Sequence, residues 1–174
     1  MEQVKELPEV EILRPQVEDW QEVKNLRLEA LQKEPQAFGA TYESALTITD
    51  ENWQTRISNS LGENPKELLV VARENGEFVG MIAAYPKTET TWNIISVYVK
   101  EEYRGQKISS RLFQQILDLL ESNIKPQNIE LTVNVQQEAA IQLYLRNGFQ
   151  IIDTLKNQKL GDGKLYDEYL MRKV

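Results

Sequence analysis

The sequence contains no cysteine and no histidine among its 174 residues. Without cysteine the chain has no disulfides, no thiolate nucleophile and no zinc–thiolate site. Without histidine it lacks the commonest general base and metal ligand of proteins. Any catalysis must therefore use Glu, Asp, Tyr, Lys or Ser side chains or backbone groups, and we expect that no metal is required.

Long apolar runs and a secretory signal are also missing. No apolar run approaches the length that spans a membrane. The start of the chain, MEQVKELPEVEILRP, carries acids where a signal peptide needs a basic start and an apolar core. We therefore expect a cytoplasmic protein with no membrane partner.

Positive charge is scarce, since the formal net charge is −7. This balance argues against nucleic-acid binding, which depends on neutralising phosphates, and slightly favours a cationic substrate. A chain of this size buries about 70% of its unfolded surface, enough for one sizeable core. We expect a single domain over residues 1–174, with a core of about 9–172.

Apolar periodicity predicts an α+β domain in the order strand, two or three helices, three strands, helix, strand, helix and two strands. Asn75 and Gly76 form a strong hairpin signal between the second and third strands. The two late helices each connect strands, which implies some parallel pairing. The predicted helices cover about residues 17–31, 50–61, 108–120 and 137–147, and the strands about 10–13, 67–75, 76–86, 91–99, 128–135, 149–155 and 164–173. Residues 35–46 are predicted as an irregular stretch or a short helix.

The segment VKEEYRGQKISSRL, residues 99–112, concentrates basic and small polar residues at one strand-to-helix turn. A helix N-terminus offers unpaired N–H groups and a partial positive charge, so such a turn can hold a phosphate. The alternative is a solvated charge run that the acids at 101–102 partly offset. Neither a nucleotide-kinase phosphate loop nor a G-x-G-x-x-G pattern is present. The cations of this segment are Lys100, Arg104, Lys107 and Arg111.

Two segments, VYVKEEYRGQKISSRLFQQIL and AAIQLYLRNGF, resemble the signature segments of the GNAT superfamily of acetyl-CoA-dependent N-acetyltransferases. The stretch LRLEALQKEPQAFGATYESA also resembles the first-helix region of many bacterial members. The resemblance extends from about residue 9 to the end. It implies the GNAT fold, a mixed, mostly antiparallel sheet of six to seven strands flanked by helices.

The resemblance implies that acetyl-CoA binds at this turn as cosubstrate. The family segment reads Arg or Gln, two variable residues, Gly, one variable residue, then Gly or Ala. Lys107 stands at the central Gly and Ser109 at the final Gly or Ala. A left-handed backbone at Lys107 would cost about 1 kcal/mol and crowd the pyrophosphate, whereas a helical backbone would let its side chain point outward.

The expected coenzyme contacts come from three places in the sequence. Residues 104–109 would hold the pyrophosphate, and Val97 and Val99 would offer backbone groups to the pantetheine arm, although their side chains also suit a sheet core. Asn134 would contact the coenzyme or lie at a separation of strands. The full set is Val97, Val99, Arg104, Gly105, Gln106, Lys107, Ile108, Ser109 and Asn134.

Transfer of an acetyl group to an amine needs a base, an oxyanion donor and an acid for the sulfur. The resemblance places the oxyanion donor at a backbone N–H near Val97 and the acid at Tyr144. The alternative for Tyr144 is an aromatic residue that only packs within its amphipathic helix. Glu43, in ATYESA, lies in the implied acceptor region, where a partly buried carboxylate can take a proton. Tyr42 and Glu89 are competing candidates, and an ordinary exposed carboxylate is the alternative.

The sequence therefore predicts an N-acetyltransferase that moves an acetyl group from acetyl-CoA to a primary amine of a small molecule or peptide by direct attack. The alternative is a non-catalytic acyl-CoA-binding or protein-interaction domain of the same fold, suggested by Lys107 and Ser109. A homodimer is also an expectation, since dimers are common in the resembled family.

Overall fold

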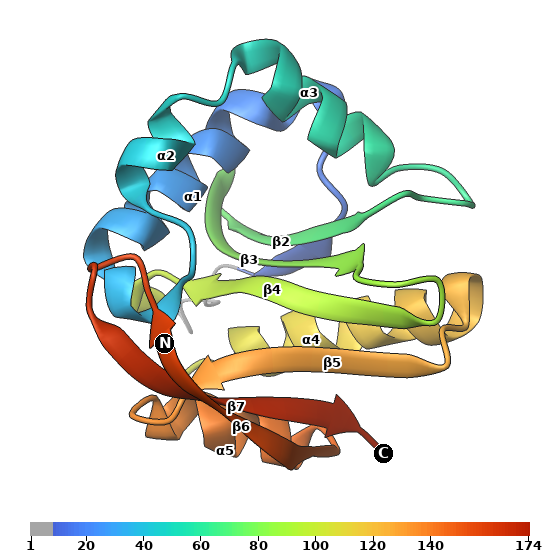
Figure 1. Cartoon of the computed structure of the whole chain (residues 1–174). Coiled ribbons are helices and arrows are strands. Elements are labelled where there is room, and N and C mark those ends of the chain that lie inside the picture. Colours follow the sequence, from blue (N-terminus) through green and yellow to red (C-terminus); the bar gives the residue numbers. More distant parts are fainter. Residues whose placement is uncertain (1–8) are drawn as a thin grey trace, which may run out of the picture.

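A seven-stranded sheet forms the centre of the structure, in the order β1-β2-β3-β4-β5-β7-β6 (Figure 1). This computed structural model describes residues 9–174, so the acidic start of the chain at residues 1–8 lies outside the described residues. The predicted fold class, a mixed and mostly antiparallel sheet flanked by helices, is confirmed. The strands are β1 (Glu11–Leu13), β2 (Leu68–Glu74), β3 (Glu77–Pro86), β4 (Thr91–Val99), β5 (Asn128–Asn134), β6 (Phe149–Lys159) and β7 (Leu165–Lys173).

The helices begin close to the positions that their sequence signals indicate. Thr49 caps its helix by accepting a hydrogen bond from the Asn52 N–H at 3.2 Å. The stretch that the sequence left open contains a short 3-10 turn, η2 (Pro35–Ala37), and one short helix capped by Thr41. The α-helices are α1 (Trp20–Lys33), α2 (Tyr42–Leu46), α3 (Asp50–Asn59), α4 (Ile108–Leu119) and α5 (Glu138–Arg146).

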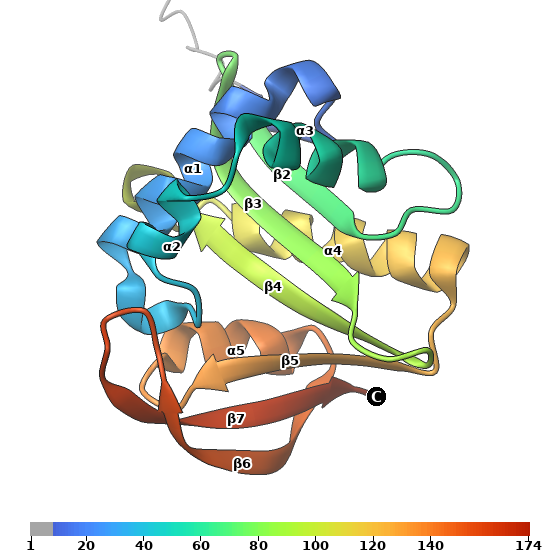
Figure 2. The same cartoon turned by 45° about the horizontal axis from the view of Figure 1, so that its top comes forward.

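The helices cover the two faces of the sheet unequally. Figures 1 and 2 show α4 and α5 on one face and α1, α2 and α3 on the other. The apolar stripe of α4, with Leu112, Phe113 and Ile116, is fully buried in the core on its own face. A second core packs Leu26 of α1 and Ile57 of α3 against the opposite face. Within residues 9–174, no helix is both long and apolar enough to cross a membrane.

The two late crossovers have different outcomes. The crossover through α4 makes β4 and β5 parallel neighbours, as the sequence predicted. The crossover through α5 gives no parallel pair in the described sheet, because β7 returns between β5 and β6 and is antiparallel to both. Parallel pairing is therefore confined to β4 and β5.

Candidate active site

β4 and β5 pair at their starts and then separate. Their parallel register consists of Thr91↔Asn128, Trp92↔Ile129 and Asn93↔Glu130. Beyond these pairs the strands continue to Val99 and Asn134 without pairing, and Figure 2 shows them diverging toward their carboxyl ends. Backbone N–H and C=O groups on the separated edges need other hydrogen-bonding partners. An extended ligand can therefore bind along this part of β4.

A β-bulge lies in the separated part of β4. The register with β3 shifts so that Ser96 and Val97 together oppose Ile82. Ser96 has a left-handed backbone with φ of 60°, which costs about 1 kcal/mol or more in a residue other than glycine. Because a bulge interrupts the ladder, it turns backbone groups away from regular pairing. The N–H near Val97, expected as the oxyanion donor, thus lies at an irregular position of the strand.

The turn between β4 and α4 also has unusual backbone geometry. Gly105 and Lys107 have φ of 79° and 62°, so the left-handed alternative for Lys107 is the one observed. Its side chain is exposed, and no side chain caps α4 at this residue. The first N–H groups of α4 therefore have no side-chain acceptor at the cap, and they carry the partial positive charge of the helix N-terminus.

Arg104 is held by the protein instead of projecting freely from the turn. Its Nε donates to the Val99 carbonyl oxygen at 2.9 Å, and its guanidinium forms an ion pair with Glu34. Lys107 and Arg111 are exposed and form no ion pair with any of residues 9–174. The free positive charge of the turn therefore comes from Lys107 and Arg111.

Val97, Val99 and Asn134 all lie on the separated parts of β4 and β5. The Val99 side chain belongs to the core on the α4–α5 face, and Val97 packs against that core. Asn134 is 2% exposed; its Nδ2 donates to the Gln36 carbonyl at 3.1 Å, and its Oδ1 accepts from the Gln136 N–H at 2.9 Å. Asn134 therefore ties the end of β5 to the segment that follows α1.

Tyr144 lies in α5 with its ring buried against Phe113, at 5.3 Å between ring centroids. It shares one apolar cluster with Val97 of the bulge. Burial raises the pKa of its phenol above the ordinary value, so the hydroxyl stays protonated at neutral pH and is a hydrogen-bond donor, although burial makes it a weaker acid. The structure thus shows the packing of the ring, and the acid role stays a prediction.

Glu43 is exposed in the first turn of α2, which differs from the partly buried carboxylate that the sequence suggested. The buried residue of this short helix is Ala45, so Glu43 points away from the packed side. Glu89 is exposed in the β3–β4 connection, and Tyr42 is partly buried. These three candidates line neither of the two hollows described below.

A cavity of ≈ 280 Å³ lies between the two helices α1 and α3 and the sheet. We call it the α1–α3 cavity. Its wall includes Ile95 and Ser96 of β4, the residues directly before Val97. The cavity therefore reaches the bulge from the face opposite α4 and α5. Its other apolar lining residues include Val23, Trp53, Ile57, Leu69 and Met81.

Three charged residues line the α1–α3 cavity: Arg27, Arg56 and Glu67. Burial, and then the neighbouring Arg56, lower the pKa of Arg27 to about 10. Burial raises the pKa of Glu67 above its ordinary value, although Arg56 opposes this shift. A carboxylate with a raised pKa in the lining of the cavity that reaches the bulge is better suited to accept a proton than the exposed Glu43.

The sequence contains a signal for Arg27 in the apolar period of α1. Arg27 follows Val23 by four residues and precedes Leu31 by four, so the helical period places it on the buried stripe of α1. A charged residue within an apolar stripe needs a special environment. Glu67 gave no comparable signal, because it precedes β2 in a stretch without distinctive spacing.

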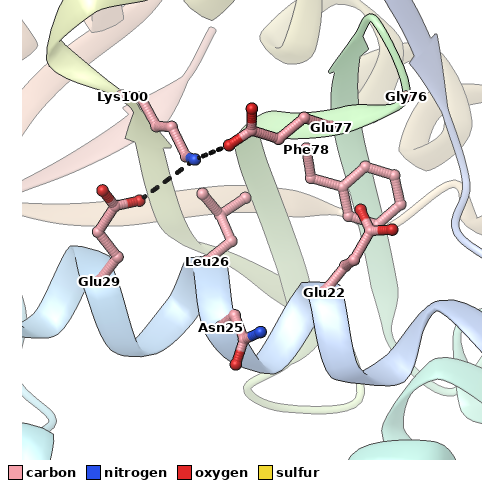
Figure 3. Close-up of a pocket in the computed structure, with 8 residues that line it drawn as sticks. All are labelled: Glu22, Asn25, Leu26, Glu29, Gly76, Glu77, Phe78 and Lys100. Carbon is pink, nitrogen blue, oxygen red and sulfur yellow. Dashed lines mark hydrogen bonds and ion pairs between the residues drawn. The ribbon is translucent and has the colours of Figure 1, made fainter.

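A larger hollow of ≈ 440 Å³ lies between α1 and the β2–β3 hairpin (Figure 3). Lys100, which lines this hollow, forms ion pairs with Glu77 and, at 3.8 Å, with Glu29. These two acids, together with the charge of Glu102, therefore offset the first cation of the turn. Within residues 9–174, no group of His, Cys, Asp or Glu side chains could hold a metal ion. Ile95 and Ser96 of the separated part of β4 line the smaller cavity, so the smaller cavity is the candidate acceptor site.

The separated parallel strands, the bulge and the uncapped helix together define an acyl-CoA N-acyltransferase fold. The model of the acetyltransferase (GNAT) family matches residues 20–149, and the chain belongs to this family. The resemblance read from the two signature segments and the predicted enzyme class, an acyltransferase, are confirmed.

Individual relatives are distant. The L-amino acid N-acetyltransferase AaaT of Escherichia coli (strain K12) is 26% identical over 129 residues, which cover 72% of this chain and 77% of that protein. An acetyltransferase of the GNAT family from Streptococcus pneumoniae has a TM-score of 0.80 at 20% identity, covering 95% and 99% of the two chains. YncA from Salmonella typhimurium, solved with acetyl-CoA, has a TM-score of 0.78 at 17% identity, covering 94% and 92%.

Proposed function

We propose that this protein transfers an acetyl group from acetyl-CoA to a primary amine, with residues 9–174 acting as one domain. The observation that carries this proposal is the separation of β4 and β5 beside an uncapped helix N-terminus. These features offer an extended backbone edge and an anion seat at adjacent positions. The pantetheine arm of acetyl-CoA, which is joined to a pyrophosphate, needs both. A cytoplasmic location and a homodimer stay predictions.

The coenzyme would contact the turn and the separated strands. The N–H groups of Gly105, Gln106, Lys107, Ile108 and Ser109 would bind the pyrophosphate. Val97 would offer its backbone to the pantetheine arm. Val99 and Arg104 would position the turn, because they hydrogen-bond to each other. Asn134 would hold the end of β5 apart from β4 through its bond to Gln36.

The chemistry follows from the groups around the bulge. The amine nitrogen attacks the thioester carbon, and the backbone N–H near Val97 stabilises the oxyanion. The new C–N bond forms as the C–S bond breaks, and the leaving thiolate takes a hydrogen bond or a proton from the Tyr144 hydroxyl, which then regains its proton from solvent. The proton of the amine passes to a carboxylate, either directly or through water. Glu67 is our preferred acceptor of this proton, and Glu43 is the candidate that the sequence favoured.

Thiol release from acetyl-CoA in the presence of a panel of primary amines tests the proposal. We expect turnover with at least one amine, together with a higher melting temperature when acetyl-CoA is added. Stabilisation by acetyl-CoA without thiol release would instead support the non-catalytic alternative. Absence of both would refute the coenzyme site.

The Tyr144→Phe variant tests the assignment of the acid. We expect the rate to fall roughly ten- to a hundred-fold, because losing one hydrogen bond to a charged group costs about 1.5–3 kcal/mol. Acetyl-CoA affinity and the melting temperature should stay nearly unchanged, since the ring and its packing on Phe113 remain. Wild-type turnover would leave Tyr144 with a packing role only.

Two glutamate variants compare the candidates for the base. Glu67→Gln should lower the rate most at neutral pH and less at high pH, where more of the amine is already unprotonated. Glu43→Gln should have a smaller effect, because Glu43 is exposed and lines neither hollow. The opposite order would return the role to Glu43.

A further inference from the structure

The α1–α3 cavity carries excess positive charge in an acidic protein. Its charged residues are two arginines and one glutamate, whereas the whole chain has a net charge of −7. Arg56 is close enough to Arg27 to disfavour the charged form of Arg27. Two like charges in a partly desolvated site are costly unless an anion joins them.

Buried polar atoms of the residues that line this cavity lack partners. Nη1 of Arg27 and Nε1 of Trp53 are buried donors that make no hydrogen bond with any of residues 9–174. Oε1 of Glu67 is a buried acceptor that likewise has no donor among these residues. Buried polar groups are almost always paired in folded proteins, so each of these atoms needs an explanation. Two donors without an acceptor, beside one acceptor without a donor, match a ligand that carries both charges.

Aromatic rings position the two guanidinium groups. Arg27 lies over the ring of Phe38, at 4.9 Å from its carbon Cζ to the ring centroid. Arg56 lies over the ring of Trp53 at 5.4 Å. Stacking holds a guanidinium plane in place while its N–H edge stays available. A planar carboxylate can accept two hydrogen bonds from such an edge.

The remaining lining favours a small apolar group. Side chains of Val23, Ile57 and Met81 contribute to the walls. The volume of ≈ 280 Å³ lies just below the range of about 300–1,000 Å³ that is usual for drug-sized ligands. A small molecule therefore suits the cavity better than a folded protein surface.

We infer that the α1–α3 cavity binds a zwitterionic acceptor, an amino acid with an apolar side chain, whose carboxylate pairs with Arg27. Glu67 lies in the same lining and faces the ammonium group, while the apolar walls contact the side chain. The inference rests on the proposed acetyl transfer, because the amine must reach the bulge at Ser96 and Val97. It excludes the N-terminus of a peptide as the preferred acceptor, since a peptide has no carboxylate next to its amine.

A matched pair of acceptors tests the inference. L-leucine and L-leucinamide share the amine and the side chain and differ in the carboxylate. The amine of leucinamide is less basic, so more of it is unprotonated at neutral pH, and a preference for leucine cannot come from amine reactivity. We expect kcat/KM, measured by thiol release from acetyl-CoA, to be at least tenfold higher for leucine.

Two variants of Arg27 and one control variant test whether Arg27 causes the preference for leucine over leucinamide. Arg27→Gln and Arg27→Lys should each lower kcat/KM for leucine at least tenfold and change that for leucinamide less than twofold. Lys keeps the charge but lacks the two-pronged edge of Arg. Arg73→Gln is the control, because Arg73 lies in the same protein on β2, pairs with the exposed Glu11 and is absent from the cavity lining. It should leave both acceptors unaffected.

A binding measurement separates failure of the inference from failure of the proposed function. With coenzyme A present, L-leucine should raise the melting temperature of the wild type but not of Arg27→Gln. Equal turnover of leucine and leucinamide would overturn the inference and leave the acetyltransferase function intact. Stabilisation by leucine that depends on Arg27, without thiol release from either amine, would support the carboxylate site and overturn acetyl transfer. The absence of both stabilisation by leucine and turnover of leucine would overturn the inference.

Discussion

Glu130 and Arg27 are both charged residues in desolvated surroundings, yet the protein treats them differently. Glu130 is 4% exposed and accepts hydrogen bonds from Arg172 at 2.6 and 3.0 Å and from Lys87 at 3.3 Å. Arg27 has an aromatic ring beneath it and no anionic partner among residues 9–174. The paired charge of Glu130, in the last β4–β5 pair, therefore stabilises the fold, whereas the unpaired charge of Arg27 in the α1–α3 cavity is available to the proposed ligand.

The pKa directions of the two carboxyl groups agree with this difference. Burial alone would raise the pKa of Glu130, but the hydrogen bonds from Arg172 and Lys87 outweigh burial and lower it. The pKa of Glu67 in the cavity is raised, because burial there exceeds the effect of Arg56. Ionisable groups that line a cavity, have a shifted pKa and lack an ion-pair partner are characteristic of functional sites.

Removing Arg172, a partner of the buried Glu130, should have the largest effect on the free energy of unfolding. Arg172→Ala leaves the buried Glu130 with Lys87 alone and should lower the free energy of unfolding by about 2 kcal/mol. We keep the value below that of a fully buried pair because the Arg172 side chain is 41% exposed. Urea unfolding measures the change, and kcat per folded molecule should stay unchanged.

Arg27→Gln is the matched comparison in the same urea experiment. Removing an unpaired, desolvated charge should leave the free energy of unfolding equal to or higher than that of the wild type. A loss as large as that of Arg172→Ala would mean that Arg27 is structural, and the distinction between the two sites would disappear.

Gly161→Ala should disturb the surroundings of Arg27 in the α1–α3 cavity without affecting the ion pairs of Glu130. The Gly161 N–H donates to the Phe38 carbonyl at 2.8 Å, which holds the segment that carries the ring beneath Arg27. An added Cβ would lie 2.6 Å from the carbonyl oxygen of Ala40, a backbone atom that must shift. We expect a loss of about 1–2 kcal/mol in stability and a higher KM for leucine.

Gly39→Ala is the control for this change, because a Cβ at Gly39 meets nothing within 4 Å. It should leave stability and KM close to wild type, as measured by urea unfolding and thiol release. If both alanine variants behave alike, the contact of Gly161 with the 35–40 segment does not position the acceptor site.

Lys107→Gly extends the comparison to the coenzyme turn. Relief of the left-handed backbone is worth up to about 1 kcal/mol, partly offset by the greater freedom of glycine in the unfolded chain. Calorimetric affinity for acetyl-CoA should stay the same or improve, whereas Arg104→Ala should weaken it by loosening the turn from Val99 and Glu34. Equal weakening by both variants would make Lys107 a phosphate ligand.

The smallest expected effect is on the pH dependence of stability, to which Glu130 and Glu67 contribute with opposite signs. The lowered pKa of Glu130 contributes stability that is present above the ordinary glutamate value of about 4.3 and is lost as pH falls through its folded pKa. The raised pKa of Glu67 does the reverse, so stability falls as pH rises from that value through its folded pKa. Unfolding of Glu130→Gln and Glu67→Gln across pH 3–8 should therefore differ from wild type with opposite slopes. Slopes of the same sign would contradict the comparison.

The sequence predicted the elements well where local patterns are strong. The hairpin at Asn75–Gly76, the Thr49 cap and the limits of β4 depend on neighbouring residues, and all are observed. The position of β7 between β5 and β6 was not predictable, because sheet order depends on long-range pairing. The separation of β4 and β5 was expected only from the family resemblance, because no residue pattern within either strand specifies it.

The candidate site was predictable in part for a related reason. The turn at 104–109 is one continuous segment, so its residues could be chosen from the sequence, whereas the α1–α3 cavity gathers side chains from α1, α3 and three strands. Arg27 and Glu67 are forty residues apart in the chain. Their shared lack of partners becomes visible only when the packing around them is known.

A crystal structure with coenzyme A and N-acetyl-L-leucine would test the central claim most directly. We predict that the pantetheine arm lies along β4 at Val97, between the separated parts of β4 and β5, with the pyrophosphate at the N-terminus of α4. The acetyl group of the product should lie near the bulge, and its carboxylate should pair with Arg27. A coenzyme bound elsewhere, or a product carboxylate turned away from Arg27 into solvent, would contradict the account.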